Sequence, residues 1–105
     1  NDDAVQSRNI KIIISAINDS NMSVRINTLN HLIYKDQDLY SEIIKLVNSK
    51  KTGISLLKAA LTAISGYRLD EITKKHIIKL LVHENRDIRV LALRALKKDE
   101  ELKRL

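Results

Sequence analysis

One stretch of the sequence decides the fold: Asp87-Ile88-Arg89-Val90-Leu91-Ala92-Leu93-Arg94-Ala95-Leu96. Its apolar residues recur at the spacing of a helix with one buried face. The residues of that face are Ile88, Leu91, Ala92, Ala95 and Leu96. Asp87 precedes them, and an aspartate at that place can cap a helix by accepting hydrogen bonds from the N–H groups of its first turn. The stretch therefore predicts an amphipathic helix, with Leu91 and Leu96 at the centre of the core.

The same pattern occurs twice earlier in the chain. Ser23, Ser55 and Asp87 are all residues that favour helix N-caps, each precedes an apolar residue, and they are equally spaced in the sequence. We name this spacing, from Ser23 to Ser55 and from Ser55 to Asp87, the repeat interval. Asp38 and Asp70 form a second series with the same interval. Self-similarity at a fixed interval is typical of stacked helical repeats.

Apolar spacing and polar turns together predict six helices in three antiparallel pairs. The expected helices cover residues 4–17, 24–34, 39–47, 56–64, 71–81 and 88–96, and Gly66 suits a left-handed position after the fourth of them. The corresponding repeats span about 3–35, 36–67 and 68–98. Residues 99–105 are a tail or the start of a further repeat, because Asp99, Glu100 and Glu101 resemble the acidic first turn of a helix. With Asn1 at its start, the chain is expected to be part of a longer protein.

Composition favours a single all-α domain over residues 1–105. The chain is 44% hydrophobic but only 3% aromatic, with no Pro and two Gly, so the core must be aliphatic and few residues break helices. It has no Cys, which excludes disulfides and thiolate metal sites and favours the cytoplasm or another reducing compartment. No apolar run approaches the length of a membrane span. The net charge of +6 arises entirely after residue 50.

The residues of the opening stretch carry a family resemblance. Residues 88–96 resemble the V-R-x-x-A-x-x-A-L pattern of the second helix of the HEAT repeat, a relative of the armadillo repeat. Residues 24–32 match the ends of that pattern, but Thr28 and His31 replace its two alanines; residues 56–64 keep both alanines but have Leu57 in place of the arginine. The resemblance implies an α-solenoid of about three helix pairs in a right-handed superhelical stack, with the second helix of each pair on the concave surface.

On a helical wheel, one sector of these second helices is polar and forms a candidate binding ridge. Asn30, Thr62 and Arg94 occupy one column of that sector and are separated by the repeat interval. Lys58, Lys97 and Lys98 adjoin the column, so the ridge becomes basic towards the C-terminal end. An ordinary solvated helix face is the competing interpretation, because charged helix surfaces are common.

Two arginines lie between apolar positions and are expected to be structural. Arg25 and Arg89 each need a carboxylate or carbonyl partner to be tolerated there. We expect Asp19 to serve Arg25, and Asp87 or a neighbouring turn to serve Arg89.

No catalytic residue, metal site, cofactor site or small-molecule site is predicted. The sequence has no nucleophile signature, no glycine-rich phosphate loop and no H-x-x-x-H pair. The leading hypothesis is a non-catalytic scaffold that presents a concave helical surface to a protein or peptide. Two alternatives remain: binding of the nucleic-acid backbone by the basic C-terminal half, and an architectural spacer within a longer solenoid.

Overall fold

The structure of the chain is a computed structural model that describes residues 2–105, with side chains from residue 5 onward. The described residues form six helices: α1 (Asp2–Ile17), α2 (Met22–Asn30), α3 (Gln37–Val47), α4 (Ile54–Ile64), α5 (Glu71–Leu80) and α6 (Arg86–Lys103). The all-helical fold class predicted from the sequence is confirmed.

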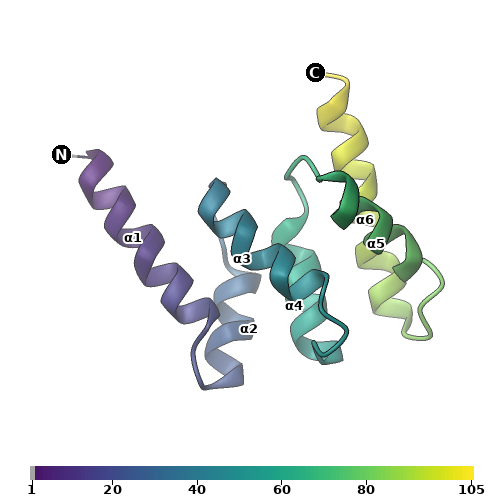
Figure 1. Cartoon of the computed structure of the whole chain (residues 1–105), viewed down its shortest axis with the longest axis horizontal. Coiled ribbons are helices and arrows are strands. Elements are labelled where there is room, and N and C mark those ends of the chain that lie inside the picture. The colour runs from purple at the N-terminus through teal and green to yellow at the C-terminus, as the bar shows by residue number, and fades with distance from the viewer. Residues whose placement is uncertain (1) are drawn as a thin grey trace.

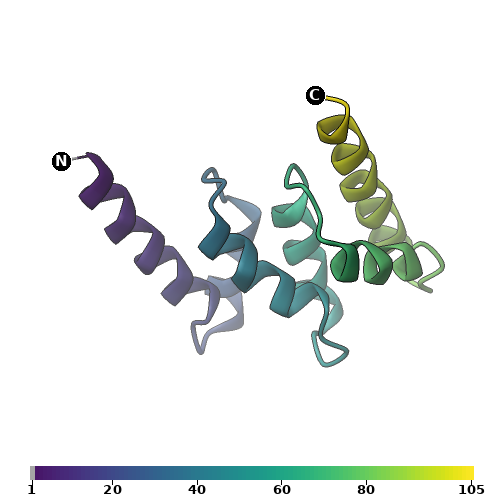
Figure 2. The same ribbon diagram turned by 45° about the horizontal axis from the view of Figure 1, so that its top comes forward.

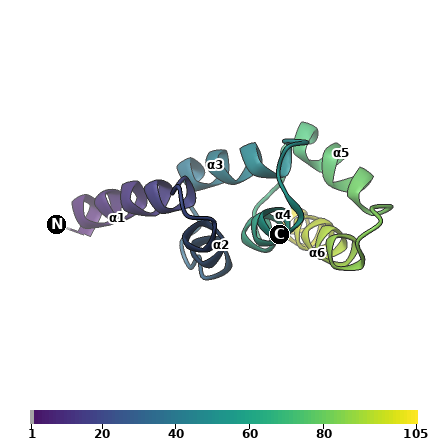
Figure 3. The same ribbon diagram turned by 90° about the horizontal axis from the view of Figure 1, so that it is seen from below.

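The helices follow one another in pairs and form two layers (Figure 1). Within the pairs, α1 packs on α2, α3 on α4 and α5 on α6. Between pairs, α3 contacts both α1 and α5, and α4 contacts both α2 and α6. Figure 3 shows α1, α3 and α5 along one edge, which we name the odd layer, and α2, α4 and α6 along the other, the even layer. The molecule is flat, with extents of 44 × 37 × 20 Å.

The repeat interval holds in the structure, but the caps that carry it differ from the prediction. The N-caps of the even layer are Asn21, Gly53 and Asn85, each two positions before the predicted Ser23, Ser55 and Asp87. The Asn21 and Asn85 side chains accept hydrogen bonds from the N–H groups of Val24 and Ile88, both at 3.2 Å, and so begin the helices earlier.

In the odd layer, one predicted cap is confirmed and one is wrong. Asp70 caps α5 as predicted, accepting from the N–H of Thr73. Asp38 does not cap α3, because the Asp36 carboxylate accepts from the N–H groups of Asp38 and Leu39 and begins the helix earlier. Gly66 adopts the predicted positive φ, 103°, just after the end of α4.

The largest departure from the prediction is the length of α6. The sequence suggested a helix that ends near Leu96 and a new start at Asp99, but α6 continues without a break to Lys103 (Figure 2). Its buried positions are Ile88, Ala92, Ala95 and Asp99, at helical spacing. The buried face therefore continues through a carboxylate, which apolar periodicity does not detect.

The core consists of aliphatic side chains from all six helices and centres on α4. Leu61, Ile64 and Ala60 of α4 are fully buried, because this helix is enclosed by α2, α3 and α6. Leu91 and Leu96, predicted at the centre, are only partly buried at its margin. The smaller Ala92 and Ala95 occupy the close contact instead, since a small side chain lets two helices approach.

Candidate functional site

The predicted ridge column lies on the surface of the even layer. Asn30 of α2, Thr62 of α4 and Arg94 of α6 are all exposed. The Thr62 hydroxyl donates to the Lys58 carbonyl at 2.9 Å, within its own helix. The three side chains thus form a polar column across three successive helices, and none of them holds the helices together.

Lys58 has a different place from the rest of the ridge. Its ammonium group lies 3.2 Å from the carboxylate of Asp87, in an ion pair that joins α4 to the first turn of α6. Lys58 is only partly exposed. It therefore belongs to the contact between two helices rather than to the free ridge, and Asp87 serves this pair instead of capping α6.

Lys97 and Lys98 join Arg94 at a shallow groove along α6. The groove has a volume of about 310 Å³ and is lined by Val90, Leu93, Arg94, Lys97, Lys98 and Glu101. Lys98 lies 3.5 Å from Glu101, one helical turn away, while both side chains remain exposed. The structure thus places two exposed apolar side chains beside the basic end of the ridge, a feature that the sequence-based ridge did not include.

Arg25 and Arg89 bind backbone carbonyl groups in the turn before their own helix. Arg25 Nε donates to the Ile17 carbonyl at 2.7 Å, and Arg89 donates to the carbonyls of His83 and Glu84 at 2.8 and 3.1 Å. The neighbouring turn expected for Arg89 is thus its partner, and Asp87 is not. Asp19 does not serve Arg25 but accepts from the N–H of Asn21 at 2.7 Å. The arginines satisfy carbonyl groups left free where the preceding helix ends.

In the middle pair, Leu57 takes the place of the arginine and is buried in the core. Just before the same helix, Thr52 donates its hydroxyl to the Leu46 carbonyl in the last turn of α3 at 2.7 Å. The middle pair therefore has a side-chain bond to the end of its first helix without an arginine.

Two tyrosines bind the N-caps of odd-layer helices, which the sequence did not predict: Tyr40 of α3 joins the second pair to the third, and Tyr67, after α4, joins the two helices of the second pair. The Tyr40 hydroxyl donates to the Asp70 carboxylate and accepts from the N–H of Asp70 at 2.9 Å. The Tyr67 hydroxyl accepts from the N–H of Asp36 at 3.1 Å. The two rings lie 5.2 Å apart. Each hydroxyl thus binds the N-terminal end of an odd-layer helix.

The ionisation of this cluster follows from its burial and hydrogen bonds. Burial, supported by the hydrogen bond to Asp70, raises the pKa of Tyr40 to about 12. For Asp70, burial acts to raise the pKa, but hydrogen bonds from Tyr40 and Thr73 outweigh it and hold the pKa below its usual value. At neutral pH, a neutral phenol therefore donates to an ionised carboxylate.

Asp99 is a buried carboxylate that ties α6 to the segment before α5. With 1% of its surface exposed, it accepts from the N–H of Leu69 at 2.9 Å and from Arg68 Nε at 3.0 Å. Lys74 Nζ lies 3.7 Å away. Burial acts to raise the pKa of Asp99, but the hydrogen bonds from Leu69 and Arg68 and the nearby cations lower it overall. The only sequence signal for this role was an acidic residue at a buried helical position.

Two asparagines make equivalent bonds along the odd layer. Asn18, after α1, donates to Glu42 of α3 at 2.9 Å, and Asn48, after α3, donates to the buried Thr73 of α5 at 3.0 Å. Hydrogen bonds from Lys45 and Asn18 hold the pKa of Glu42 below its usual value. These bonds explain the polar residues at the ends of two odd-layer helices as joints between successive pairs.

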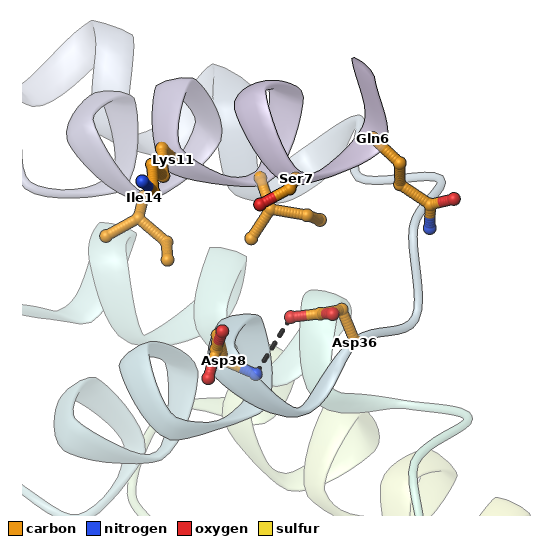
Figure 4. A pocket seen from close by; sticks show the side chains of 7 residues that line it. Gln6, Ser7, Lys11, Ile14, Asp36 and Asp38 are labelled. Atoms are coloured by element: carbon orange, nitrogen blue, oxygen red, sulfur yellow. Dashed lines mark hydrogen bonds between the residues drawn. The ribbon is translucent and has the colours of Figure 1, made fainter. Parts of the chain in front are cut away.

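A second depression, of about 330 Å³, lies between α1 and the N-terminal end of α3. Its lining residues are Gln6, Ser7, Ile10, Lys11, Ile14, Asp36 and Asp38, most of them visible in Figure 4. The Asp36 carboxylate is occupied by the cap of α3, which Figure 4 shows as its bond to the N–H of Asp38. This carboxylate is therefore accounted for by the start of a helix.

Among the described side chains, those of residues 5–105, no group of three or more His, Asp and Glu could hold a metal ion. Within the same residues, no helix combines the length and apolarity required to cross a bilayer.

The ionisation of His76, on α5, follows from its surroundings. Burial and the charges of Lys79 and Lys50 lower the pKa of its imidazole.

The fold and the site define an all-helical protein built of three successive helix pairs with a polar column along one layer. Neither known protein families, nor curated proteins, nor solved structures provide a match to the chain.

Proposed function

We propose that the chain is a HEAT-like α-solenoid of three antiparallel helix pairs, stacked in a right-handed superhelix, that acts as a non-catalytic interaction module. Two features support the stacking: successive helices contact one another within each layer, and the even-layer caps recur at the repeat interval. A structure in which each pair contacts only its neighbours is typical of repeat proteins.

The proposed binding surface is the exposed side of the even layer. Helices of the even layer pack more closely on one another than those of the odd layer, which supports curvature towards the even side. The observation that carries the proposal is the column Asn30, Thr62 and Arg94, exposed on three successive helices and free of structural bonds between them. A polar column on a concave surface suits an extended peptide or a helix of a partner protein.

A protein or peptide suits this surface better than nucleic acid. The basic side chains are divided between α6 and the odd-layer helix α5, where Lys75 and Lys79 are exposed. Lys58 and Lys98 already have carboxylate partners. Tyr40 and Tyr67 are buried, so they are not free to stack on bases.

Selection from a displayed library of random peptides tests the proposal. We expect selected peptides to bind the chain and to lose at least about tenfold in affinity against Thr62→Glu with Arg94→Glu, since both side chains lie on the ridge. Ser41→Glu with Lys79→Glu changes the net charge equally on the odd layer, where both residues are exposed, and should leave binding unchanged.

Titration with duplex DNA at two salt concentrations separates the alternatives. Salt-sensitive DNA binding that is lost in Arg94→Glu would replace the peptide function by nucleic-acid binding. If peptide affinity falls only in the odd-layer variant, Ser41→Glu with Lys79→Glu, the ridge is not the binding surface. If neither library nor DNA binds, the architectural spacer is favoured.

A further inference from the structure

The last helix of the even layer retains an apolar side chain that the earlier helices bury. Leu29, Leu61 and Leu93 occupy the same position in α2, α4 and α6, separated by the repeat interval. Leu29 and Leu61 are 1% and 0% exposed, because α4 packs on α2 and α6 packs on α4. Leu93 is 51% exposed, since within residues 2–105 no helix follows α6 in this layer.

A second position repeats the pattern. Ile26 of α2 and Lys58 of α4 are both partly buried beside the next helix, and Lys58 pairs there with Asp87. Val90, the equivalent residue of α6, is 45% exposed. Val90 and Leu93 therefore lie on the side of α6 that corresponds to the side of α4 covered by α6.

The opposite end of the even layer is more polar, although Val24 is exposed there. The side of α4 and α6 that faces the preceding helix carries four buried alanines: Ala60, Ala63, Ala92 and Ala95. In α2 the equivalent residues are Thr28 and His31. The Thr28 hydroxyl donates to the Val24 carbonyl at 2.7 Å, and His31 Nδ1 donates to the Asn27 carbonyl at 2.8 Å. The polar groups of Thr28 and His31 are thus satisfied by carbonyl groups of their own helix.

From this asymmetry we propose that Val90, Leu93, Arg94, Lys97, Lys98 and Glu101, which we name the end face, bind an acidic amphipathic helix. The bound helix packs on α6 as α6 packs on α4, with its apolar stripe on Val90 and Leu93. Its carboxylates lie against Arg94, Lys97 and Lys98. The ridge and the end face share Arg94, Lys97 and Lys98, whereas Val90 and Leu93 belong to the end face alone. A substitution of Leu93 therefore tests the end face separately from the ridge.

The charges of the end face favour an acidic partner helix over a basic one. Three cations and one carboxylate surround the apolar pair, so an acidic helix is complementary and a basic one is repelled. The contact between α4 and α6 offers a precedent, because there Lys58 of the receiving helix pairs with Asp87 of the arriving helix. Carboxylates flanking an apolar stripe would repeat that arrangement one helix further along.

Two other occupants fit less well. A second copy stacked head-to-tail would place Asn27, Thr28 and His31 of α2, together with Val24, on Leu93. That contact would bury polar groups against an apolar surface at a cost. A nucleic acid would use the cations but would leave Val90 and Leu93 without apolar partners.

The test uses two synthetic helical peptides with the same leucine stripe, one flanked by Glu and the other by Lys. Fluorescence anisotropy with the whole chain should show binding of the Glu peptide and at least about tenfold weaker binding of the Lys peptide. Leu93→Ser should weaken the Glu peptide by at least about tenfold. The matched control Val24→Ser, at an exposed apolar residue of the opposite end, should leave its affinity unchanged.

Circular dichroism of each variant shows that it is folded, as expected for changes at half-exposed side chains. Equal affinity for both peptides, no binding of the Glu peptide, or binding insensitive to Leu93→Ser would overturn the proposal. Self-association of the unmodified chain that is abolished by Leu93→Ser would overturn it in favour of a second copy. Displacement of the Glu peptide by duplex DNA would overturn it in favour of a nucleic acid.

Discussion

The first and last helices of the even layer carry different side chains at equivalent positions. On the side that a preceding helix would cover, α2 has Thr28 and His31, whereas α6 has the buried Ala92 and Ala95. On the side that a following helix would cover, α2 buries Leu29, whereas α6 exposes Leu93. The outer side of the first helix thus carries Thr28 and His31 beside Val24, whereas that of the last helix carries Val90 and Leu93 among charged residues.

This difference shows how departures from a repeat pattern can be interpreted. Thr28 and His31 weaken the resemblance of residues 24–32 to the HEAT pattern, yet they are the residues that suit α2 to its place at the edge of the layer. Alanine is required only where another helix approaches closely. Thr28 and His31, which depart from the pattern, therefore mark a side of the helix that no other described helix covers. Leu93, an apolar residue kept on such a side, marks a candidate binding face.

Among changes that involve polar side chains, exchanging the side chains of the two ends should produce the largest effect. Ala95→His places an imidazole where the native residue is 1% exposed, and we expect it to destabilise the fold by about 3 kcal/mol through overpacking and burial of a polar ring. His31→Ala, the reverse change at the exposed equivalent position, should cost less than about 1 kcal/mol. Denaturant unfolding of both variants measures the difference. Equal losses would contradict the difference in packing between these two equivalent positions.

The Asp99 carboxylate at the C-terminal end should give the next largest effect. Asp99→Asn weakens the bonds to Arg68 and to the N–H of Leu69, and we expect a loss of about 2 kcal/mol at neutral pH. Urea unfolding monitored by circular dichroism gives this value. The control Glu101→Gln alters an exposed carboxylate on the same helix and should change stability by less than about 0.5 kcal/mol.

The contribution of Asp99 should also depend on pH. Since its pKa in the folded state lies below that of an unfolded aspartate, the ionised carboxylate stabilises the fold above about pH 3.9. That contribution is lost as the pH falls through the folded-state pKa. The difference in unfolding free energy between the native chain and Asp99→Asn should therefore shrink as the pH is lowered from neutral. A difference that stays constant would show that the carboxylate charge plays no part.

The tyrosine hydroxyls between helix pairs should contribute less. Tyr40→Phe removes a donor to Asp70 and an acceptor for its N–H, and we expect a cost of about 1–2 kcal/mol. Tyr67→Phe removes the acceptor for the N–H of Asp36 and should cost about 1 kcal/mol. Thermal unfolding of the two variants gives the order. A larger effect for Tyr67 would show that the bond within the second pair is stronger than the bond between the second and third pairs.

Much of the fold was predictable because helices repeat their apolar positions. Six helices, the repeat interval, the Asp70 cap and the exposed column of Asn30, Thr62 and Arg94 all followed from spacing. The exact caps did not, since Asn21 and Ser23, or Asp36 and Asp38, are chemically similar and only backbone geometry selects between them.

The polar joints were beyond sequence reasoning. The length of α6 depends on Asp99, whose burial is possible only because Arg68 and Leu69, far earlier in the chain, supply donors. The turn expected for Arg89 is its partner, but Arg25 binds the Ile17 carbonyl instead of Asp19, and side-chain patterns do not reveal which carbonyl is free. The end face could not be predicted either. Leu93 occupies the same position in its helix as Leu29 and Leu61, and only the structure shows that it is exposed while they are buried.

The smallest expected effect tests the difference between the two ends most directly. Leu29→Ala, Leu61→Ala and Leu93→Ala remove the same side chain from the same position of three successive helices, and denaturant unfolding measures the cost of each. We expect about 2–5 kcal/mol for Leu29 and Leu61, because each leaves a cavity in a packed contact. We expect less than about 1 kcal/mol for Leu93, which no helix of residues 2–105 covers. A loss at Leu93 as large as that at Leu61 would contradict the exposed apolar side of α6.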